Sequence, residues 1–271
     1  MARPWRSAIL PLVLLFMPGE SAYHGARSEV VTPSTRRSGR SECDRARFRV
    51  VLDVGHTIEV PGAISARGVP EYEFNLRLAR KMEETLLDRG FDRTVVLITG
   101  GAAYSSLVSR VARANSLPAD LFLSVHHDSV PERFLRTWEH DGQQRRFSDE
   151  FKGHSIFISR DNGQAKSSLL FARFLGEQLK NRGLRYTTHY AETFMGERQR
   201  KLVDAAAGVY RYDQLIVLRD TRMPAVLLEA GSIINRDEEK LMTDPRHQSR
   251  ISAAVADAVE VFCSLRPSQS K

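Results

Sequence analysis

Sustained apolar runs are scarce in this 271-residue sequence. The one near the N-terminus, Ala8 to Met17, covers about ten residues, whereas a membrane-spanning helix needs about 20. No internal repeat is present. Nucleic-acid motifs are missing as well, and no aromatic residue interleaves with the arginines of residues 36–47, so the net charge of +7 does not indicate a nucleic-acid partner.

Cysteine is scarce too, with two residues, Cys43 and Cys263. Neither lies near the N-terminal apolar run, which excludes a lipid-modified N-terminal cysteine. Two alternatives remain for the pair. In an oxidising compartment they form a disulfide that ties the two ends of the folded region together; otherwise they are unpaired buried thiols.

What surrounds the apolar run is typical of a secretory signal peptide. Basic residues precede it and small residues follow it (Arg3 and Arg6; Gly19, Ser21 and Ala22). We therefore expect residues 1–22 to be a signal peptide and the protein to be exported, either periplasmic or associated with the cell wall, with no stable membrane insertion after signal cleavage. An uncleaved N-terminal anchor is the alternative.

The remaining chain divides by composition. Residues 23–46 are rich in Ser, Arg, Gly and Thr and are interpreted as a basic flexible linker, which either attracts an anionic wall or membrane surface or simply aids solubility. Residues 47–265 form the folded domain, with 131–152 as an inserted loop or lid because charged residues interrupt the pattern there, and 266–271 are a tail. Apolar content of 42% is enough for a full core.

Within 47–265, apolar strand patterns alternate with amphipathic helix patterns. The expected strands are 49–54, 94–99, 121–126, 155–159, 215–218 and 225–229, and the expected helices are 71–87, 107–115, 168–180 and 245–263. This alternation predicts an α/β fold with a single domain, in which helices cover both faces of a mostly parallel twisted sheet of about six strands.

Groups with metal-binding or acid–base capacity lie at the expected strand ends. His56, His126 and Glu229 each follow or end a strand, and Glu71 opens the first helix. Because ligands gather at the carboxyl ends of parallel strands, two imidazoles and one carboxylate there fit a hydrolytic zinc site, with the other carboxylate as the general acid/base. Taken singly, each histidine also fits a hydrogen-bonded core residue, and Glu71 fits a carboxylate that complements the helix dipole.

Three ordered motifs carry a resemblance to a known family. The stretch VVLDVGHTIEVPGAISARGVPEYEFNLRLA resembles the opening of zinc-dependent N-acetylmuramoyl-L-alanine amidases of the type 3 family, VVIDPGHGG…GAxG…G…EKxxNLxxA. LFLSVHHDS is similar to that family's LFISIHANA, and PAVLLEAGSIINRDEEKLM to its PavLvElGFlsNpeEeklL. The resemblance covers about residues 48–262. Departures at Val54, Thr57, Ile58 and Ser232 affect loop shape more than chemistry.

The resemblance implies a role for each residue of the cluster. His56, Glu71 and His126 would bind one zinc ion (Zn2+), and Glu229 would be the catalytic glutamate that takes a proton from the attacking water and passes it to the leaving L-alanine nitrogen. His127 is the alternative to His126, since successive strand residues face opposite ways; the motif register favours His126, with His127 as a supporting or substrate-binding group.

The remaining histidines and two arginines before the last strand are further candidates for the site. The other histidines are expected to be ordinary surface or loop residues (His24, His140, His154, His189 and His247), with an approach of His154 and His189 to the cleft left open. Arg219 and Arg222 fit surface charge better than a stem-peptide carboxylate site. No long inhibitory helix like that of some cell-division amidases is expected, because SIFISRDNG runs almost directly into the 168–180 helix, so 131–152 is the candidate for restraint. Residues 23–46 are too short for a wall-targeting domain, so none is expected there.

The resemblance implies a peptidoglycan hydrolase that cleaves the amide bond between N-acetylmuramic acid and L-alanine of the stem peptide. Peptidoglycan is the expected partner, and a protein activator is left open. Two alternatives stand beside this prediction: a zinc peptidase acting within the stem peptide, and a catalytically silent peptidoglycan-binding protein.

Overall fold

The computed structural model describes residues 43–265, so the expected signal peptide 1–22, most of the linker and the tail 266–271 lie outside the described residues. The centre of the domain is a seven-stranded sheet in the order β2-β1-β3-β9-β6-β8-β7. Its strands are β1 (Val50–Val54), β2 (Val95–Leu97), β3 (Leu121–Asp128), β6 (Ser155–Ile158), β7 (Lys201–Asp204), β8 (Val209–Arg211) and β9 (Ala225–Ser232).

The sheet is mostly parallel. Strands β2, β1, β3 and β9 run in one direction, β6 is antiparallel to β9 and parallel to β8, and β7 is antiparallel to β8. The carboxyl ends of β1, β3 and β9 therefore meet at one edge, and the amino end of β6 lies at that same edge. This confirms the predicted α/β class and places the strand-end residues together.

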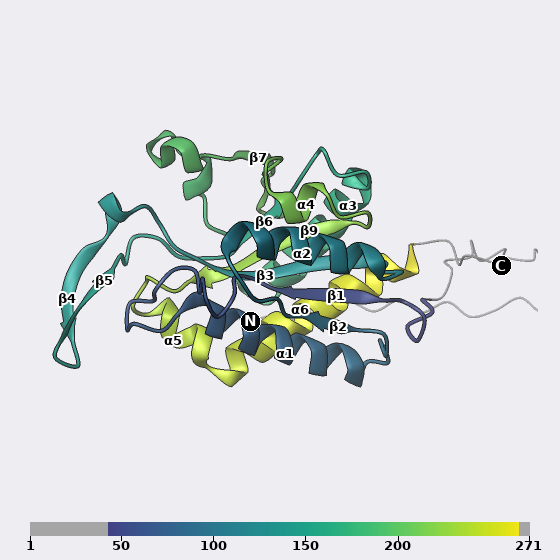
Figure 1. The fold of residues 1–271 in the computed structure, drawn as a ribbon, viewed down its shortest axis with the longest axis horizontal. Coiled ribbons are helices and arrows are strands. Elements are labelled where there is room, and N and C mark those ends of the chain that lie inside the picture. Colours follow the sequence, from purple (N-terminus) through teal and green to yellow (C-terminus); the bar gives the residue numbers. More distant parts are fainter. Residues whose placement is uncertain (1–42, 266–271) are drawn as a thin grey trace, which may run out of the picture. The chain divides into compact units, whose positions relative to one another are not determined.

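Helices cover both faces of the sheet, as predicted (Figure 1). Helices α1 (Glu71–Asp88), α3 (Ala165–Asn181) and α6 (Pro245–Ser264) pack on one face, where α6 lies between the other two. Helices α2 (Ala103–Ser116) and α4 (Ile216–Arg219) cover the other face, and the short α5 (Glu238–Thr243) follows β9.

Strand β1 shows why the sequences of the central strands are nearly continuous apolar runs. Leu52 and Val54 pack into the core under α1 and α6, whereas Val51 belongs to the core under α2 and α4. All five residues of β1 are buried. A strand covered on both faces has no solvent side, so apolar and polar residues do not alternate along it.

One predicted strand is wrong. Residues 215–218 were expected to be a strand, but they enter the helical turn α4, in which the Arg219 amide donates to the Leu215 carbonyl at 2.9 Å. The turn buries Val217 and Leu218 against the sheet. A short apolar run satisfies burial as a strand or as a helical turn, which explains the error. The sheet is completed instead by β7 and β8, which were not predicted.

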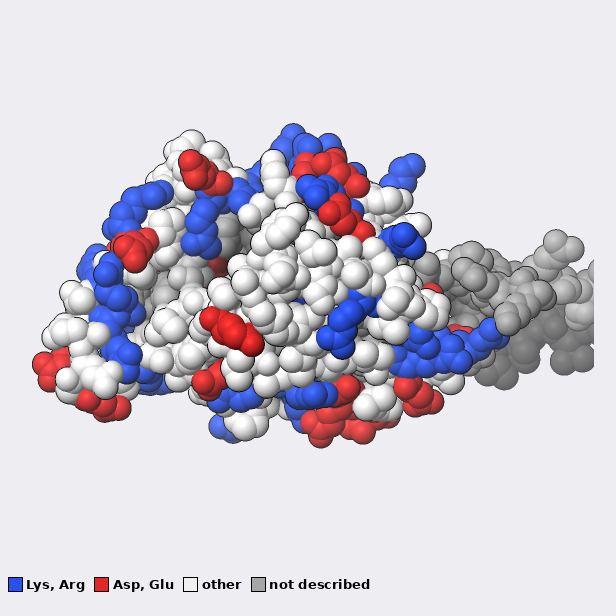
Figure 2. Space-filling model, viewed as in Figure 1, with Lys and Arg blue, Asp and Glu red and all other residues white. Residues whose placement is uncertain are grey.

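The inserted segment 131–152 contains regular structure. A 3₁₀ turn (Glu132–Phe134) leads into an antiparallel hairpin of β4 (Arg136–His140) and β5 (Gln143–Phe147), which projects from the body of the domain (Figure 1). Lys and Arg side chains lie along the hairpin and acidic side chains at its tip (Figure 2).

Aromatic and cationic contacts hold the hairpin to the domain. The Trp138 indole N–H donates to the Ala66 carbonyl at 3.0 Å, in the loop before α1. The Arg236 guanidinium lies over both Trp138 and Phe147, 5.1 and 3.9 Å from the ring centroids. The hairpin is thus fastened to both loops that flank the carboxyl edge of the sheet.

Cys43 and Cys263 form a disulfide, with Cα atoms 5.2 Å apart and a sequence separation of 220. This settles the two alternatives in favour of the bond. An ion pair between Arg45 and Glu260, with Nε and Oε2 2.9 Å apart, lies beside it. Across residues 43–265, none of the helices combines the length and the hydropathy that crossing a bilayer requires.

Candidate metal centre

Three of the strand-end groups form one compact cluster. Glu71 lies between two imidazoles: its Oε2 is 3.0 Å from His56 Nε2, and its Oε1 is 3.1 Å from His126 Nδ1. One donor atom from each residue lies within 4.8 Å of the other two. Sequence reasoning placed these residues at one edge, and the fold brings them into direct contact.

His56 is held in an uncommon backbone conformation. Its φ is +67°, in the left-handed region that a non-glycine residue rarely adopts and that is found disproportionately at functional sites. The buried guanidinium of Arg110 donates to the backbone carbonyls of His56 and Val54. The chain thus turns sharply out of β1 and presents the imidazole at the sheet edge.

Glu71 is the first residue of α1, and backbone and side-chain donors hold its carboxylate. Ala63 N–H donates to Oε2 at 3.2 Å, and the Asn75 amide, one turn along the helix, donates to Oε1 at 3.2 Å. Burial by itself would raise the pKa of the carboxyl, but hydrogen bonds from the His126 and His56 imidazoles outweigh it and hold that pKa well below its usual range. Glu71 is therefore an anion.

Two glycines leave space around the cluster. A Cβ added to Gly55 would lie 2.4 Å from the His126 ring, and one added to Gly62 would lie 2.5 Å from Glu71 Oε2 and 2.8 Å from His56 Nε2. The cluster can therefore form only because both positions lack a side chain. Two imidazoles and one anionic carboxylate form a donor set that suits a zinc ion with an open fourth position, so these residues fit the metal.

His127 points away from this cluster. Its ring Nδ1 is 2.8 Å from Asn75 Oδ1, and the ring packs against Phe74 with centroids 5.6 Å apart. Burial lowers the pKa of the His127 imidazole to about 3. His127 thus supports Asn75, which in turn holds Glu71, while His126 faces the cluster.

Glu229 lies next to the cluster on β9, in register with His126 of β3. Its Oε2 is buried and has no hydrogen-bond partner within residues 43–265. Burial, reinforced by the nearby carboxylates of Asp128 and Glu71, raises the pKa of Glu229 well above its usual range. A buried carboxyl oxygen without a partner, beside three groups that could hold a metal ion, is suited to exchange a proton with a bound molecule.

Comparison with known proteins identifies this arrangement. Residues 50–261 match the family model for N-acetylmuramoyl-L-alanine amidase (Amidase_3). The chain belongs to this amidase family.

Curated and solved relatives agree with the assignment. The chain is 26% identical over 218 residues to the probable cell wall amidase LytH of Staphylococcus aureus, covering 79% of this chain and 58% of that protein. It thus spans less than two thirds of the length of this relative.

Two solved amidase structures have the same fold. The amidase Ami1 of Mycobacterium smegmatis superposes with a TM-score of 0.64 at 20% identity, over 83% of this chain and all of that one. The catalytic domain of the amidase CwlV from Bacillus (Paenibacillus) polymyxa var. colistinus gives a TM-score of 0.58 at 26% identity, over 81% and 99% of the two chains.

A buried polar cluster around Asp128 lies near Glu229 in this member of the amidase family. This cluster was not predicted from the sequence. Asp128 accepts a hydrogen bond from the Tyr190 hydroxyl at 2.6 Å, and its Oδ2 is 3.3 Å from His189 Nε2. Arg198 donates to the Ser129 carbonyl at 2.8 Å and to the Tyr190 hydroxyl at 3.3 Å. One feature of the sequence could have indicated this cluster: Asp128 stands where the family pattern LFISIHANA has asparagine.

The expectation that the other histidines are ordinary surface or loop residues is wrong for three of them. His154, His189 and His247 are 4, 6 and 7% exposed. Burial lowers the pKa of His154 to about 4 and also lowers that of His247. His154 and His189 lie in segments that fold against the domain, and His247 lies on the buried side of the first turn of α6. His24 lies outside the described residues.

Arg219 and Arg222, the two candidates for binding a stem-peptide carboxylate, do not reach the candidate metal centre. Arg219 pairs with its neighbour Asp220, with Nε and Oδ1 2.6 Å apart. The Arg222 amide bonds to Asn115 at the amino end of β9, seven residues before Glu229. Strand β9 begins at Ala225, and at about 3.3 Å per residue its first four steps already place Glu229 roughly 13 Å beyond that end.

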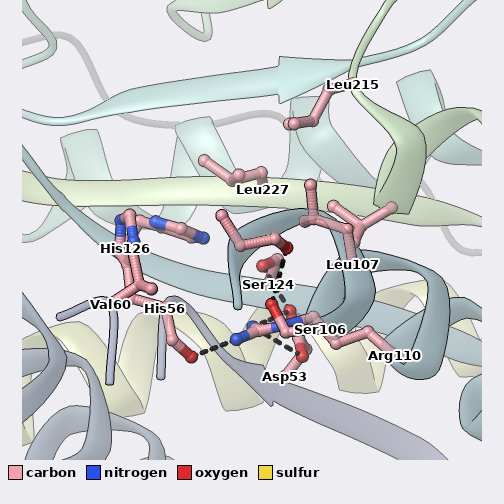
Figure 3. Close-up of a pocket in the computed structure, with 12 residues that line it drawn as sticks. Asp53, His56, Val60, Ser106, Leu107, Arg110, Ser124, His126, Leu215 and Leu227 are labelled. Carbon is pink, nitrogen blue, oxygen red and sulfur yellow. Dashed lines mark hydrogen bonds and ion pairs between the residues drawn. The ribbon is translucent and has the colours of Figure 1, made fainter. Parts of the chain in front are cut away.

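A cavity of ≈ 200 Å³ opens beside His56 and His126 on the α2 and α4 side of the sheet (Figure 3). Figure 3 shows Leu107, Leu215 and Leu227 around it, with an ion pair between Asp53 and Arg110 at its base. Asp53 and Arg110 are almost fully buried, and Arg110 Nη1 lies 3.1 Å from Asp53 Oδ1. Burial raises the pKa of Asp53, while the guanidinium opposes that rise.

Proposed function

We propose that this chain is a zinc-dependent peptidoglycan amidase that hydrolyses the bond between N-acetylmuramic acid and L-alanine of the stem peptide. The observation that carries the proposal is the unpartnered Oε2 of Glu229 beside the His56–Glu71–His126 cluster. Membership of the amidase family supports the same reaction. Because the chain spans only part of its curated relative, its activity is inferred from its own residues.

His56, Glu71 and His126 would hold the zinc ion. When bound, zinc polarises a carbonyl and lowers the pKa of a coordinated water to about 7. Glu71 keeps both imidazoles in place and supplies the negative charge of the ligand set. Asn75, Ala63 and His127 in turn restrain Glu71.

Glu229 is the group that moves the proton. It takes a proton from the water that attacks the lactyl carbonyl carbon, and a new C–O bond forms there. It then delivers that proton to the amide nitrogen as the C–N bond breaks. The products are a lactyl carboxylic acid and a peptide with a free L-alanine amine, and the proton of the acid passes to that amine or to solvent. The buried Oε2 of Glu229, which has no partner within residues 43–265, is left free for this exchange with a bound molecule.

We infer that the protein acts outside the cytoplasm, in the periplasm or at the cell wall. The Cys43–Cys263 disulfide supports an oxidising compartment, because such bonds seldom persist in a reducing cytosol. The expected signal peptide and the cell wall relative point the same way. The net charge of +7 suits an anionic wall.

Mass spectrometry of the products released from isolated peptidoglycan sacculi tests the proposal. Zinc-loaded protein should release free stem peptides that begin at L-alanine and leave peptide-free glycan strands. Shortened peptides still attached to sugar would identify a peptidase instead. Sacculi that bind the protein but yield no product, both from the wild type and from a variant lacking 131–152, would identify a silent binding protein.

A further inference from the structure

A serine hydroxyl lies across the sheet from Glu229. Ser155 is the first residue of β6 and pairs with Glu229 in the antiparallel register of β6 and β9 (Figure 1). Residues directly opposite each other in such a pair point to the same face of the sheet, with Cβ atoms about 4.5–5.5 Å apart. On its other side, Glu229 is in register with His126 of β3. The three side chains therefore form a row, in which Glu229 lies between a candidate metal ligand and the serine.

The fold itself makes no use of the Ser155 hydroxyl. The residue is 0% exposed, and its Oγ has no hydrogen-bond partner within residues 43–265. Burying a hydroxyl without a partner costs stability, and such a group in a native structure requires an explanation. An alanine at this position would fill nearly the same space without that cost. The hydroxyl is thus available to its cross-strand neighbour, Glu229.

The carboxyl group of Glu229 is available as well. Its Oε2 is buried and has no partner in the described part of the chain. Two other polar side chains of this region are oriented toward Asp128: the Tyr190 hydroxyl donates to it at 2.6 Å, and His189 Nε2 is 3.3 Å from its Oδ2. A serine hydroxyl turns about one side-chain bond, and the last torsion of a glutamate is broad and two-fold. Small rotations therefore bring the Ser155 hydroxyl to either oxygen of the carboxyl group.

We propose that Ser155 is a positioning residue for Glu229: its hydroxyl donates a hydrogen bond to one carboxylate oxygen and thereby directs the other oxygen toward the attacking water and then toward the amide nitrogen. This inference rests on the proposed function, in which Glu229 moves the proton. A carboxylate with one oxygen held samples fewer orientations, so it meets the water in the reactive geometry more often. Because Ser155 touches neither substrate nor metal in this role, it affects the chemical step and not substrate binding.

Steady-state kinetics on soluble muramoyl peptides prepared from peptidoglycan test the role. For the zinc-loaded protein, Ser155→Ala should lower kcat about tenfold to hundredfold, the range for a lost hydrogen bond to a charged group, and should leave KM and zinc content unchanged. The matched control is Ser252→Ala. Ser252 is equally buried and its hydroxyl also has no partner within residues 43–265, but it lies on α6, which packs on the opposite face of the sheet from Glu229. This control should keep the wild-type kcat.

A double variant separates positioning of Glu229 from a general structural effect. In a Glu229→Gln background, Ser155→Ala should lower the residual rate by less than about twofold, because the carboxylate that the hydroxyl positions is already absent. Equal losses in the wild-type and Glu229→Gln backgrounds would show that Ser155 acts on something other than Glu229, and would overturn the inference.

A second pair of variants tests the hydroxyl even if the alanine variant does not fold. Ser155→Thr and Ser155→Val have nearly the same shape and differ in the hydroxyl, so the threonine enzyme should have a kcat about tenfold or more above that of the valine enzyme. Equal kcat values for the two would overturn the inference.

The remaining outcomes distinguish an error in this inference from an error in the proposed function. A wild type that hydrolyses muramoyl peptides, with a Ser155→Ala enzyme of unchanged kcat, would overturn the inference and leave the proposed function standing. Loss of zinc from Ser155→Ala would also overturn it, because the serine would then act on the metal cluster. If the wild type hydrolyses neither muramoyl peptides nor sacculi, the proposed function fails and the inference fails with it.

Discussion

Arg110 reaches from the middle of α2 to the end of β1, where it pairs with Asp53 and donates to the backbone carbonyl of His56. The ion pair is almost fully buried, with exposed fractions of 2 and 0% for the two side chains. The pair lies under His56, the residue of the candidate metal centre whose backbone is in the left-handed region. The Asp53–Arg110 pair therefore supports the conformation that presents His56.

Arg110→Gln should lower the free energy of unfolding by about 3–5 kcal/mol, because it leaves the Asp53 carboxylate buried without its cation. Urea denaturation of wild type and variant measures the change. Arg113→Gln, one helical turn further on, is the control: its side chain is exposed and donates to the Ile98 carbonyl, so the cost should be about 1 kcal/mol or less. Equal losses in both variants would contradict a special role for Arg110.

Glu229→Gln should lower kcat on muramoyl peptides by about 10²–10⁴-fold, because glutamine keeps the shape but cannot accept and return a proton. Zinc content, measured by atomic absorption after dialysis, should stay at the wild-type value. Glu192→Gln, at an exposed glutamate, should change neither quantity. A Glu229→Gln enzyme of nearly normal rate would remove Glu229 from the mechanism.

His126 and His127 should respond differently to the same substitution. His126→Gln removes an imidazole from the cluster and should reduce bound zinc at least tenfold, whereas His127→Gln retains a partner for Asn75 and should keep the metal. Zinc bound after equilibrium dialysis at a fixed free concentration measures both. If the His127 variant lost the metal instead, the ligand assignment would have to move by one residue.

That the three groups of the candidate metal centre lie close together followed partly from local sequence rules, whereas their roles rested on the family resemblance. His56, His126 and Glu229 lie at the ends of strands that are buried on both faces, and parallel strands bring such ends to one edge. Glu71 opens the helix that covers the same edge. Strand direction accounts for His56, His126 and Glu229, whereas the inclusion of Glu71, on helix α1, depended on the resemblance to the amidase motif.

What surrounds the centre depends on long-range packing that local patterns do not report. Arg110 lies in an amphipathic helix pattern, where a cation normally faces solvent. It is buried because it pairs with Asp53, which is 57 residues away in sequence and therefore invisible to a local pattern. Likewise, His189 is buried because Phe151 of a distant loop packs on its ring, with centroids 5.1 Å apart. The disulfide depended on the separation of Cys43 and Cys263, which composition cannot supply.

Removing the disulfide should destabilise the domain by about 2–5 kcal/mol, because the bond closes a very long loop and restricts the unfolded chain. Thermal melting with and without a reducing agent measures the effect. The double variant Cys43→Ser/Cys263→Ser is the control: it should melt at the temperature of the reduced wild type and should not respond to the reductant. A wild-type Tm that ignores reductant, with full reduction verified by thiol titration, would contradict this prediction.

Lowering the pH should destabilise the domain through His154. Burial holds the pKa of its imidazole at about 4, against 6.5 in an unfolded chain, and neither ring nitrogen has a partner within residues 43–265. Between pH 6.5 and 4 the unfolded state therefore binds a proton that the folded state does not, so stability falls as pH falls through this window and stops changing from this cause below pH 4. The loss is about 3 kcal/mol at most.

His154→Leu removes this titration while keeping an apolar side chain at a buried position. The difference in unfolding free energy between wild type and variant, measured by urea denaturation at several pH values in the presence of a chelator, isolates the contribution of His154 from those of His127 and His247. The unfolding free energy of the variant should rise relative to that of the wild type as pH falls from 6.5 to 4. The difference between the two unfolding free energies should be constant above pH 7. A gap that does not change with pH would show that His154 titrates alike in the folded and unfolded chains, which its burial without a hydrogen-bond partner argues against.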